Sequence, residues 1–301
     1  MTRPNFFIVG APKSGTTAMA DFLDQHPQIF MGPKELNYFC PDLFRDPARV
    51  RTEADYLSWF ADAGGAAVRG DGSVFYMCSQ EAARRIHAFD PAARILMQLR
   101  NPIEMLPAHH SQVVYEGFED IADFEAAYDA EADRAAGRRV PPACPLPLIL
   151  NYRRMAAYAE QVARFQALFP PDRIKIVLFE DFQADLPAVF REILEFLGVD
   201  PGFEARFEVV NANKKVRNRA LMAFMRETPD WVTRIGRLVM SEKMRYDLKE
   251  LIKAANTKFV SRPPMASDFL ARLRRDMAPE IEKLGDLLGR DLGHWVSRPD
   301  Q

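Results

Sequence analysis

Residues 5–17 read NFFIVGAPKSGTT, and this stretch decides the fold class. It opens with an apolar run that ends at Gly10, which predicts a buried β-strand over 5–9. From Met19 onward, apolar residues recur at helical spacing, so a helix is predicted to begin at Thr16. A strand, a glycine-containing loop and a helix in this order turn backbone N–H groups and the positive helix end toward an anion.

The same order of elements recurs twice further along the chain. Apolar runs predict buried strands over 94–99 and 174–179, with helices that begin near Pro102 and Leu186. Strands that alternate with helices indicate a parallel sheet covered on both faces. The sequence therefore predicts one α/β domain over 1–301. We expect a P-loop-like, three-layer α/β/α fold with four or five strands in its central parallel sheet.

The part from about 215 to 298 differs in character. Met, Arg and Lys are frequent there, helical spacing recurs, and no run is clearly typical of a strand. The apolar spacing predicts a helix that Ser267 caps, and Pro279 suggests the start of another helix. We expect a helical C-terminal part of the same domain.

Composition limits the partners and the compartment. The chain has 301 residues and a net charge of −2, so no general attraction to nucleic acid or to an anionic membrane is expected. No run reaches the roughly 18 apolar residues of a membrane-spanning helix, and the N-terminal run is too short for a signal peptide. Three cysteines without paired spacing predict neither a disulfide framework nor a zinc site, and no metal is expected. We expect a cytoplasmic protein, and its oligomeric state stays open.

The loop over 10–17 has the glycine spacing of a Walker A motif but departs from it after the second glycine. A Walker A loop continues with lysine and then with Ser or Thr for magnesium. Here Thr16 stands at the lysine position, and the lysine lies inside the loop as Lys13. An ammonium group at this place can stabilise the charge that builds on the leaving group of an anhydride. If the transferred group carries less charge than a γ-phosphoryl group, less neutralisation is needed, and such a loop can work without magnesium.

Several segments together resemble the sulfotransferases that use 3′-phosphoadenosine 5′-phosphosulfate (PAPS). PKSGTT after an apolar strand resembles their 5′-phosphosulfate loop, and LRNPIE over 99–104 resembles their 3′-phosphate motif. PKELNYF over 33–39 and LLGRDLGHW over 287–295 are similar to segments of the heparan-sulfate-type branch. The resemblance implies transfer of a sulfuryl group from PAPS to a hydroxyl or amine of a small molecule or carbohydrate.

The resemblance also implies which residues bind the nucleotide. The 5′-phosphosulfate would be held by the loop residues Lys13, Ser14, Gly15, Thr16 and Thr17, with Lys13 also stabilising the leaving phosphate. Backbone amides, hydroxyls and one ammonium group suit such a compact anhydride.

The 3′-phosphate would be bound by Arg100, because a guanidinium binds phosphate through two donors. The family has a serine eight residues after this arginine, where Ala108 stands here. Ser111 lies on the same helix face and is the candidate to replace it. A basic cluster that includes Arg217 and Arg219 falls where the family closes a loop over the nucleotide.

Glu35 is the candidate general base, since sulfuryl transfer needs a proton removed from the acceptor as it attacks. The heparan-type pattern often has His and Asp after this glutamate, at the positions that Asn37 and Cys40 occupy here. Asp71, in a segment where the family often has an acidic residue, a hydroxyl and a tyrosine, is the next candidate together with His110.

Two other functions stay open at this level. One is a P-loop kinase or nucleotide hydrolase that uses ATP and magnesium, against which the missing Gly-Lys-Ser/Thr argues. The other is a non-catalytic homologue that only binds the nucleotide. The sequence does not name the acceptor.

Overall fold

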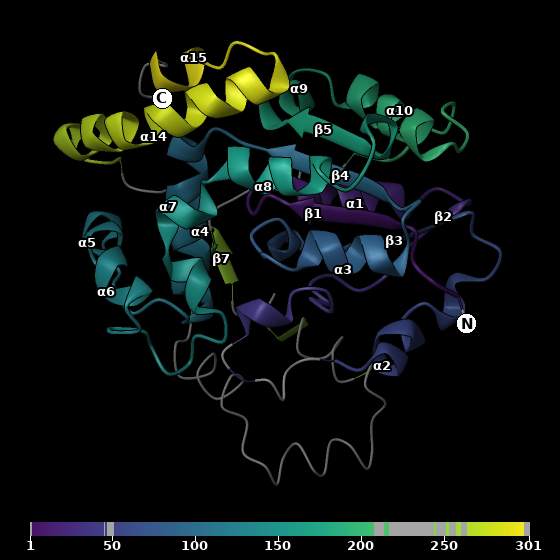
Figure 1. Ribbon diagram of the computed structural model, residues 1–301, viewed down its shortest axis with the longest axis horizontal. Coiled ribbons are helices and arrows are strands. Elements are labelled where there is room, and N and C mark those ends of the chain that lie inside the picture. Colours follow the sequence, from purple (N-terminus) through teal and green to yellow (C-terminus); the bar gives the residue numbers. More distant parts are fainter. Residues whose placement is uncertain are drawn as a thin grey trace, which may run out of the picture.

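The computed structural model describes residues 2–44, 46, 51–207, 214–216, 244, 251–252, 257–259 and 264–297. At its centre lies a five-stranded sheet in the order β2-β3-β1-β4-β5, with every neighbouring pair parallel (Figure 1). The strands are β1 (Phe6–Gly10), β2 (Ile29–Met31), β3 (Val68–Gly72), β4 (Arg94–Leu99) and β5 (Ile174–Leu178). The predicted central parallel sheet is confirmed.

Alternate residues of β1 belong to two separate cores. Phe6 and Ile8 pack with α1 and α10 on one face of the sheet, and Phe7 and Val9 pack with α3 and α8 on the other. In Figure 1, α3 and α8 lie in front of the sheet. Successive side chains of a strand point to opposite faces, so the continuous apolar run of β1 is buried on both sides. These helices are α1 (Thr16–Leu23), α3 (Ala82–Phe89), α8 (Tyr158–Gln166) and α10 (Leu186–Leu197).

The other helices among the described residues lie around this three-layer core. They are α2 (Glu53–Ser58), α4 (Pro102–Glu116), α5 (Phe124–Asp129), α6 (Glu131–Ala135), α7 (Tyr152–Met155), α9 (Phe179–Ala184), α14 (Ser267–Leu288) and α15 (His294–Ser297). Short 3₁₀ turns include η4 (Val74–Tyr76), which is separated from β3 by Ser73 alone. In the described part of the chain, no helix combines the length and the hydropathy that a bilayer crossing requires.

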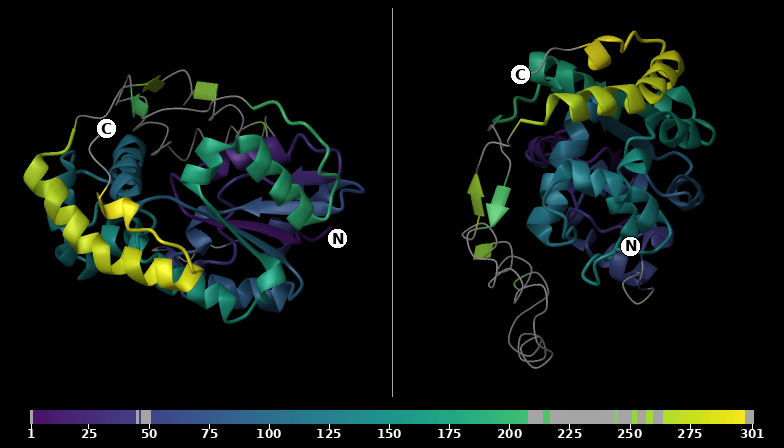
Figure 2. Two further views of the ribbon diagram at one scale, coloured as in Figure 1. Left: turned by 90° about the horizontal axis from the view of Figure 1, so that it is seen from above. Right: turned by 90° about the vertical axis from the view of Figure 1, so that its left-hand side faces the viewer.

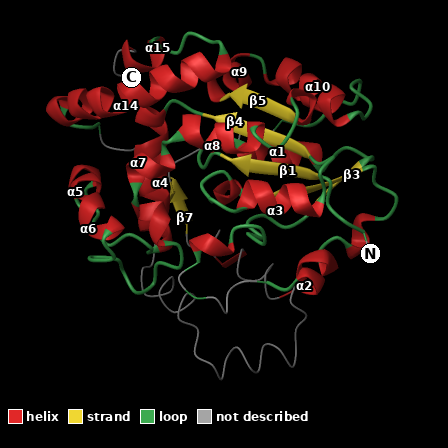
Figure 3. Cartoon of the chain, in the orientation of Figure 1, coloured by secondary structure: helices red, strands yellow, loops and turns green. Residues whose placement is uncertain are grey.

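The predicted strand and helix starts are largely confirmed. β1, β4 and β5 lie within a residue of the predicted ranges, and helices begin at Thr16, Pro102 and Leu186 as expected. β2 and β3 were not predicted, because β2 has three residues and β3 reads VRGDG, without an apolar run. In Figure 3 the arrowheads of β1, β4 and β5 point toward the side where α4 stands. The loops that follow these strands therefore gather at that edge of the sheet.

The described C-terminal part is mainly helical, as expected, but three details were wrong. β6 (Lys214–Val216) and β7 (Thr257–Phe259) form an antiparallel pair, and strands of three residues are too short to show periodicity. α14 runs through Pro279 as one helix, and its N-cap is Ala266 rather than Ser267. Its buried side chains continue on one stripe on both sides of the proline, so packing outweighs the local preference for a break.

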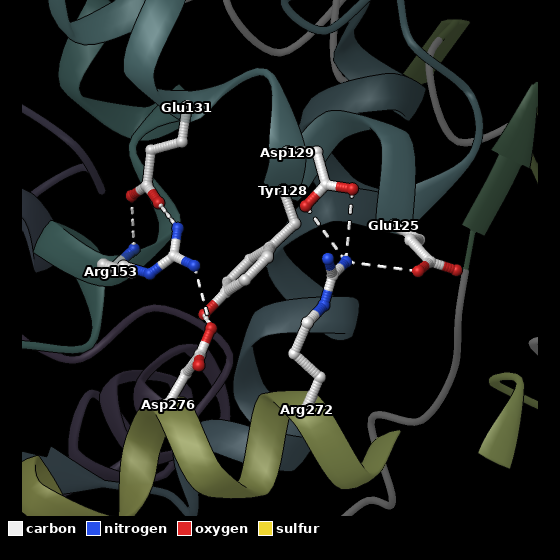
Figure 4. A network of polar contacts seen from close by, with 7 residues as sticks. All are labelled: Glu125, Tyr128, Asp129, Glu131, Arg153, Arg272 and Asp276. Carbon is white, nitrogen blue, oxygen red and sulfur yellow. Dashed lines mark hydrogen bonds and ion pairs between the residues drawn. The ribbon is translucent and has the colours of Figure 1, made fainter. Parts of the chain in front are cut away.

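Ion pairs join α14 to the helices beside the sheet (Figure 4). Arg272 pairs with Glu125 and Asp129, both on α5. On the other side, a chain of contacts runs from Asp276 through Arg153 to Glu131, and the Arg153 guanidinium also lies over the ring of Tyr128. α14 and α15 lie side by side (Figure 2). α14 also contacts α4, and the Asn101 side chain after β4 donates to the backbone oxygen of Trp295 on α15. The C-terminal segment therefore lies at the edge where the strand-end loops meet.

Candidate active site

The β1–α1 loop is shaped by two glycines. A β-carbon at Gly10 would lie 2.7 Å from Cβ of Met77, so any larger residue would clash with the turn beside it. Gly15 is the N-cap of α1 and has a φ of 83°, which glycine adopts without strain. Because Gly15 offers no side chain as a cap, the first-turn N–H groups of α1 are available to an anion. Ser14 is buried and Thr17 is exposed.

Lys13 lies between this loop and α4. Its ammonium group donates a hydrogen bond to Oε1 of Gln112, 3.3 Å away. The Gln112 amide in turn donates to Oε1 of Glu116 at 2.7 Å. Lys13 itself has a φ of 61°, in a region that residues with a side chain seldom occupy. Gln112 was not predicted, although it lies next to Ser111 on the same helix.

Arg100 follows β4 and contacts the same loop. One guanidinium nitrogen donates to the backbone oxygen of Lys13 at 3.2 Å, and two others donate to Oε2 of Glu104 at 3.2 and 3.0 Å. The guanidinium also lies 4.6 Å from the ring centre of Phe179. The structure thus brings together two residues, Lys13 and Arg100, that the sequence assigned to the two phosphate ends of one nucleotide.

Two aromatic rings that the sequence analysis missed lie beside the loop. Phe179 and Phe182 are stacked at a centroid distance of 5.9 Å. A β-carbon added at Gly15 would be 3.3 Å from each ring, so the rings pack directly against the loop. Phe179 begins α9 immediately after β5. An aromatic residue at the carboxyl end of a predicted strand was the signal available.

The structure gives less support to the other predicted nucleotide ligands, which are Ser111, Arg217 and Arg219. The Ser111 hydroxyl donates to the backbone oxygen of Pro107 at 2.9 Å, within its own helix. Donation to a phosphate would require the hydroxyl to turn away from that oxygen, so this role stays a prediction. Ala108 is buried in the core. Arg217 and Arg219 lie outside the described residues.

Glu35 lies on the loop after β2, with a φ of 58°. Part of the Glu35 surface is open to solvent. Protein atoms nevertheless lie close around its carboxylate and displace much of the water there. The loss of hydration raises the pKa of Glu35 to about 8; a hydrogen bond from the Val74 backbone lowers it, and the negative charges of Asp71 and Glu116 raise it further. A carboxylate with this pKa, within reach of solvent, has the properties of a general base near neutral pH.

The two alternative bases are placed differently. Asp71 has no exposed surface, and three hydroxyl groups donate to its carboxylate. His110 is buried, and its Nε2 lies 2.9 Å from the backbone oxygen of Ile121. Neither side chain is open to an acceptor in the way that Glu35 is. Among the described residues, no group of three or more His, Cys, Asp or Glu side chains could hold a metal ion.

Comparison with known proteins identifies the family of this chain. A sulfotransferase domain model matches residues 3–229. Human bifunctional heparan sulfate N-deacetylase/N-sulfotransferase 3 is 26% identical over 97% of this chain, which corresponds to 31% of the human protein. Human heparan sulfate glucosamine 3-O-sulfotransferase 6 is 24% identical over 70% of this chain and 57% of its own length. This chain therefore spans about a third to somewhat over half of the length of these relatives.

A solved structure extends the likeness to the whole described fold. The crystal structure of a sulfotransferase from Alicyclobacillus acidocaldarius has a TM-score of 0.72 and 27% sequence identity to this chain. The match covers 98% of this chain and 99% of the other. With the family model matching most of its length, the chain belongs to the sulfotransferase family.

Proposed function

We propose that this protein transfers a sulfuryl group from PAPS to a hydroxyl or amine of a small-molecule or carbohydrate acceptor. One observation carries the proposal beyond family membership: the Arg100 guanidinium donates to the backbone oxygen of Lys13 at 3.2 Å. This contact joins the loop proposed for the 5′-phosphosulfate to the residue proposed for the 3′-phosphate. A nucleoside phosphorylated on both its 3′ and 5′ oxygens offers one phosphate to each of these two neighbouring basic residues.

Each group of the site then has a separate role in the transfer. The N–H groups and hydroxyls of Ser14 to Thr17 bind the 5′ group at the start of α1. Lys13 stabilises the charge that develops on the departing 5′-phosphate oxygen as its bond to sulfur breaks. Glu35 accepts the proton from the acceptor oxygen or nitrogen as that atom bonds to sulfur. Arg100, with Ser111, Arg217 and Arg219, is proposed to bind the rest of the nucleotide.

The cytoplasm remains the proposed compartment, on the basis of the sequence alone.

The acceptor class follows from the relatives only as a proposal. Two relatives are named for N-sulfation of heparan sulfate and for 3-O-sulfation of its glucosamine. These names support a carbohydrate amine or hydroxyl as the first acceptor to test. Because this chain covers only part of each relative, small phenols belong in the same panel.

Nucleotide binding provides the first test. Titration calorimetry is expected to show tighter binding of adenosine 3′,5′-bisphosphate than of adenosine 5′-phosphate, since the 3′-phosphate has its own ligand. Equal affinity for the two nucleotides would contradict the assignment of Arg100. ATP turnover that requires magnesium, without binding of the bisphosphate, would favour a kinase or hydrolase instead.

Transfer itself is tested with PAPS that carries ³⁵S. We expect label to appear on N-desulfated heparan sulfate, on a phenol such as p-nitrophenol, or on a component of a cell extract, with a chelator present. Mass spectrometry of the labelled product then identifies the acceptor. A protein that binds the bisphosphate but labels nothing would be the non-catalytic homologue.

A further inference from the structure

The loop that carries Glu35 has an unfavourable backbone. Glu35 and Asn37 have φ values of 58° and 55°. Glu seldom adopts this left-handed region, because its Cβ crowds the backbone there, whereas Asn adopts it more readily. Such conformations persist only where the surrounding structure holds them. The position of the Glu35 carboxylate therefore depends on whatever tethers this loop.

Three backbone N–H groups of the loop donate hydrogen bonds to the end of β3 and to the segment that follows it. The N–H of Glu35 donates to the backbone oxygen of Gly72 at 3.1 Å. The N–H of Asn37 donates to the hydroxyl of Ser73, and that of Tyr38 to the hydroxyl of Tyr76, both at 3.0 Å. Two of the three acceptors are thus side-chain hydroxyls, and a hydroxyl accepts well only when its own hydrogen points elsewhere.

Asp71 receives those hydrogens. The Ser73 hydroxyl donates to Oδ1 of Asp71 at 2.6 Å, and the Tyr76 hydroxyl donates to Oδ2 at 2.8 Å. A third hydroxyl, that of Tyr56, also donates to Oδ2, at 2.9 Å. An ionised carboxylate can only accept, so it turns the lone pairs of Ser73 and Tyr76 toward the loop amides. Burial raises the pKa of Asp71, and the three hydroxyl donors oppose that rise.

We propose that Asp71 is a positioning residue for sulfuryl transfer: through the hydroxyls of Ser73 and Tyr76, it holds the loop that presents Glu35. The proposal rests on the proposed role of Glu35 as the base. Asp71 does not itself exchange a proton with the acceptor, because its side chain is fully buried. Its contribution is the orientation of two hydroxyls, each of which fixes one loop amide.

Two tyrosines provide a matched test. Tyr76→Phe and Tyr56→Phe each remove one hydroxyl that donates to the same oxygen of Asp71, and both side chains have no exposed surface. Only the Tyr76 hydroxyl also contacts the loop. We expect Tyr76→Phe to lower kcat by roughly 10- to 100-fold, because a small displacement of a catalytic group is costly. The affinity for adenosine 3′,5′-bisphosphate is expected to stay within about twofold, and Tyr56→Phe to keep kcat within about threefold.

The rates are measured with ³⁵S-PAPS and N-desulfated heparan sulfate as the first probe, or as release of the bisphosphate with water as acceptor. Hydrogen exchange of the Tyr38 amide is followed in the same three proteins, and we expect faster exchange in Tyr76→Phe alone. Asp71→Asn is a second variant, expected to lose at least as much kcat as Tyr76→Phe. If Asp71→Asn does not fold, the comparison of Tyr76→Phe with Tyr56→Phe still tests the positioning role.

The outcomes separate the proposal from the function on which it rests. Wild-type kcat in Tyr76→Phe, or equal losses in both phenylalanine variants, would overturn the positioning role. A wild-type protein that transfers nothing from PAPS would instead refute the proposed function. Even then, unchanged exchange of the Tyr38 amide in Tyr76→Phe would show that the hydroxyl does not hold the loop.

Discussion

The ammonium group of Lys13 and the side-chain oxygen of Gln112 are hydrogen-bonded at 3.3 Å, across 99 positions of the chain. This contact links the β1–α1 loop to α4, where Gln112 is also bonded to Glu116. The negative charge of Glu116 in turn raises the pKa of Glu35. The proposed leaving-group lysine and the proposed base are therefore coupled through one face of α4.

Lys13→Ala is expected to lower the rate of sulfuryl transfer by about 100-fold or more, the scale of losing an electrostatic donor. Nucleotide affinity should fall much less, because the charge that Lys13 stabilises develops mainly in the transition state. Lys175→Ala is the control, since Lys175 lies on β5 and pairs with Glu192 on α10. Single-turnover kinetics and calorimetry measure the two effects. Equal losses in rate and in affinity would mean that Lys13 only binds the nucleotide.

Glu35→Gln keeps the shape of the side chain and removes its basic oxygen. We expect transfer to a hydroxyl to fall by about 100- to 10,000-fold, with bisphosphate affinity near that of wild type. In wild type, kcat/KM should rise with pH through about 8, because only the ionised carboxylate accepts a proton. The pH–rate profile of the Gln variant should lack this step. Full activity in the Gln variant would assign the base to another residue.

The same carboxylate should also affect stability. The folded protein raises the pKa of Glu35 from 4.5 to about 8, so this carboxyl group loses its proton at a lower pH in the unfolded chain than in the folded protein. The stabilising effect of protonation is complete below the unfolded pKa and is lost as pH rises through the folded pKa. Thermal denaturation at about pH 5 and about pH 9 should show Glu35→Gln gaining stability relative to wild type at the higher pH. A Tm difference that does not change with pH would place the Glu35 carboxylate in a more hydrated environment.

Arg100→Ala is expected to weaken binding of adenosine 3′,5′-bisphosphate by roughly 1.5–3 kcal/mol, the scale of a hydrogen bond to a charged group. Binding of adenosine 5′-phosphate should change less, because that nucleotide has no 3′-phosphate. Arg85→Ala, which removes an exposed pair with Glu81, serves as the control for a lost surface arginine. Calorimetry with both nucleotides measures the difference. Equal weakening for both would assign Arg100 a structural role in the loop.

Trp295 on α15 links the residue that follows Arg100 to helix α9. Its indole N–H donates to Glu180 at 2.7 Å, and its backbone oxygen accepts from the Asn101 side chain at 2.9 Å. Trp295→Phe should lower the free energy of unfolding by roughly 1–3 kcal/mol, through a lost hydrogen bond and poorer packing. His294→Ala, which removes a more exposed contact with the same Glu180 carboxylate, should cost about 0.5 kcal/mol or less. Chemical denaturation compares the two variants, and similar losses would show that the buried indole bond adds little.

Local sequence determined the strands and helices that an apolar run, a proline or helical spacing marks. The apolar runs of β1, β4 and β5 are buried whichever way the sheet is ordered, and the helix starts at Pro102 and Leu186 follow from proline and apolar spacing. The departure from a Walker A loop at Lys13 was equally local, so the loop between β1 and α1 and the family could be predicted. β3 could not, because its sequence VRGDG becomes a strand only by pairing with β1 and β2.

Tertiary structure alone decided how the proposed base is held and tuned. The pairing of β3 with β1 and β2 buries Asp71, and burial converts a residue read as a possible base into the acceptor that orients Ser73 and Tyr76. The raised pKa of Glu35 has the same origin, since desolvation depends on which distant segments surround a carboxylate. A sequence motif specifies which groups are present. Their hydration and their hydrogen-bond partners depend on contacts between residues far apart in the chain, so the motif alone does not determine them.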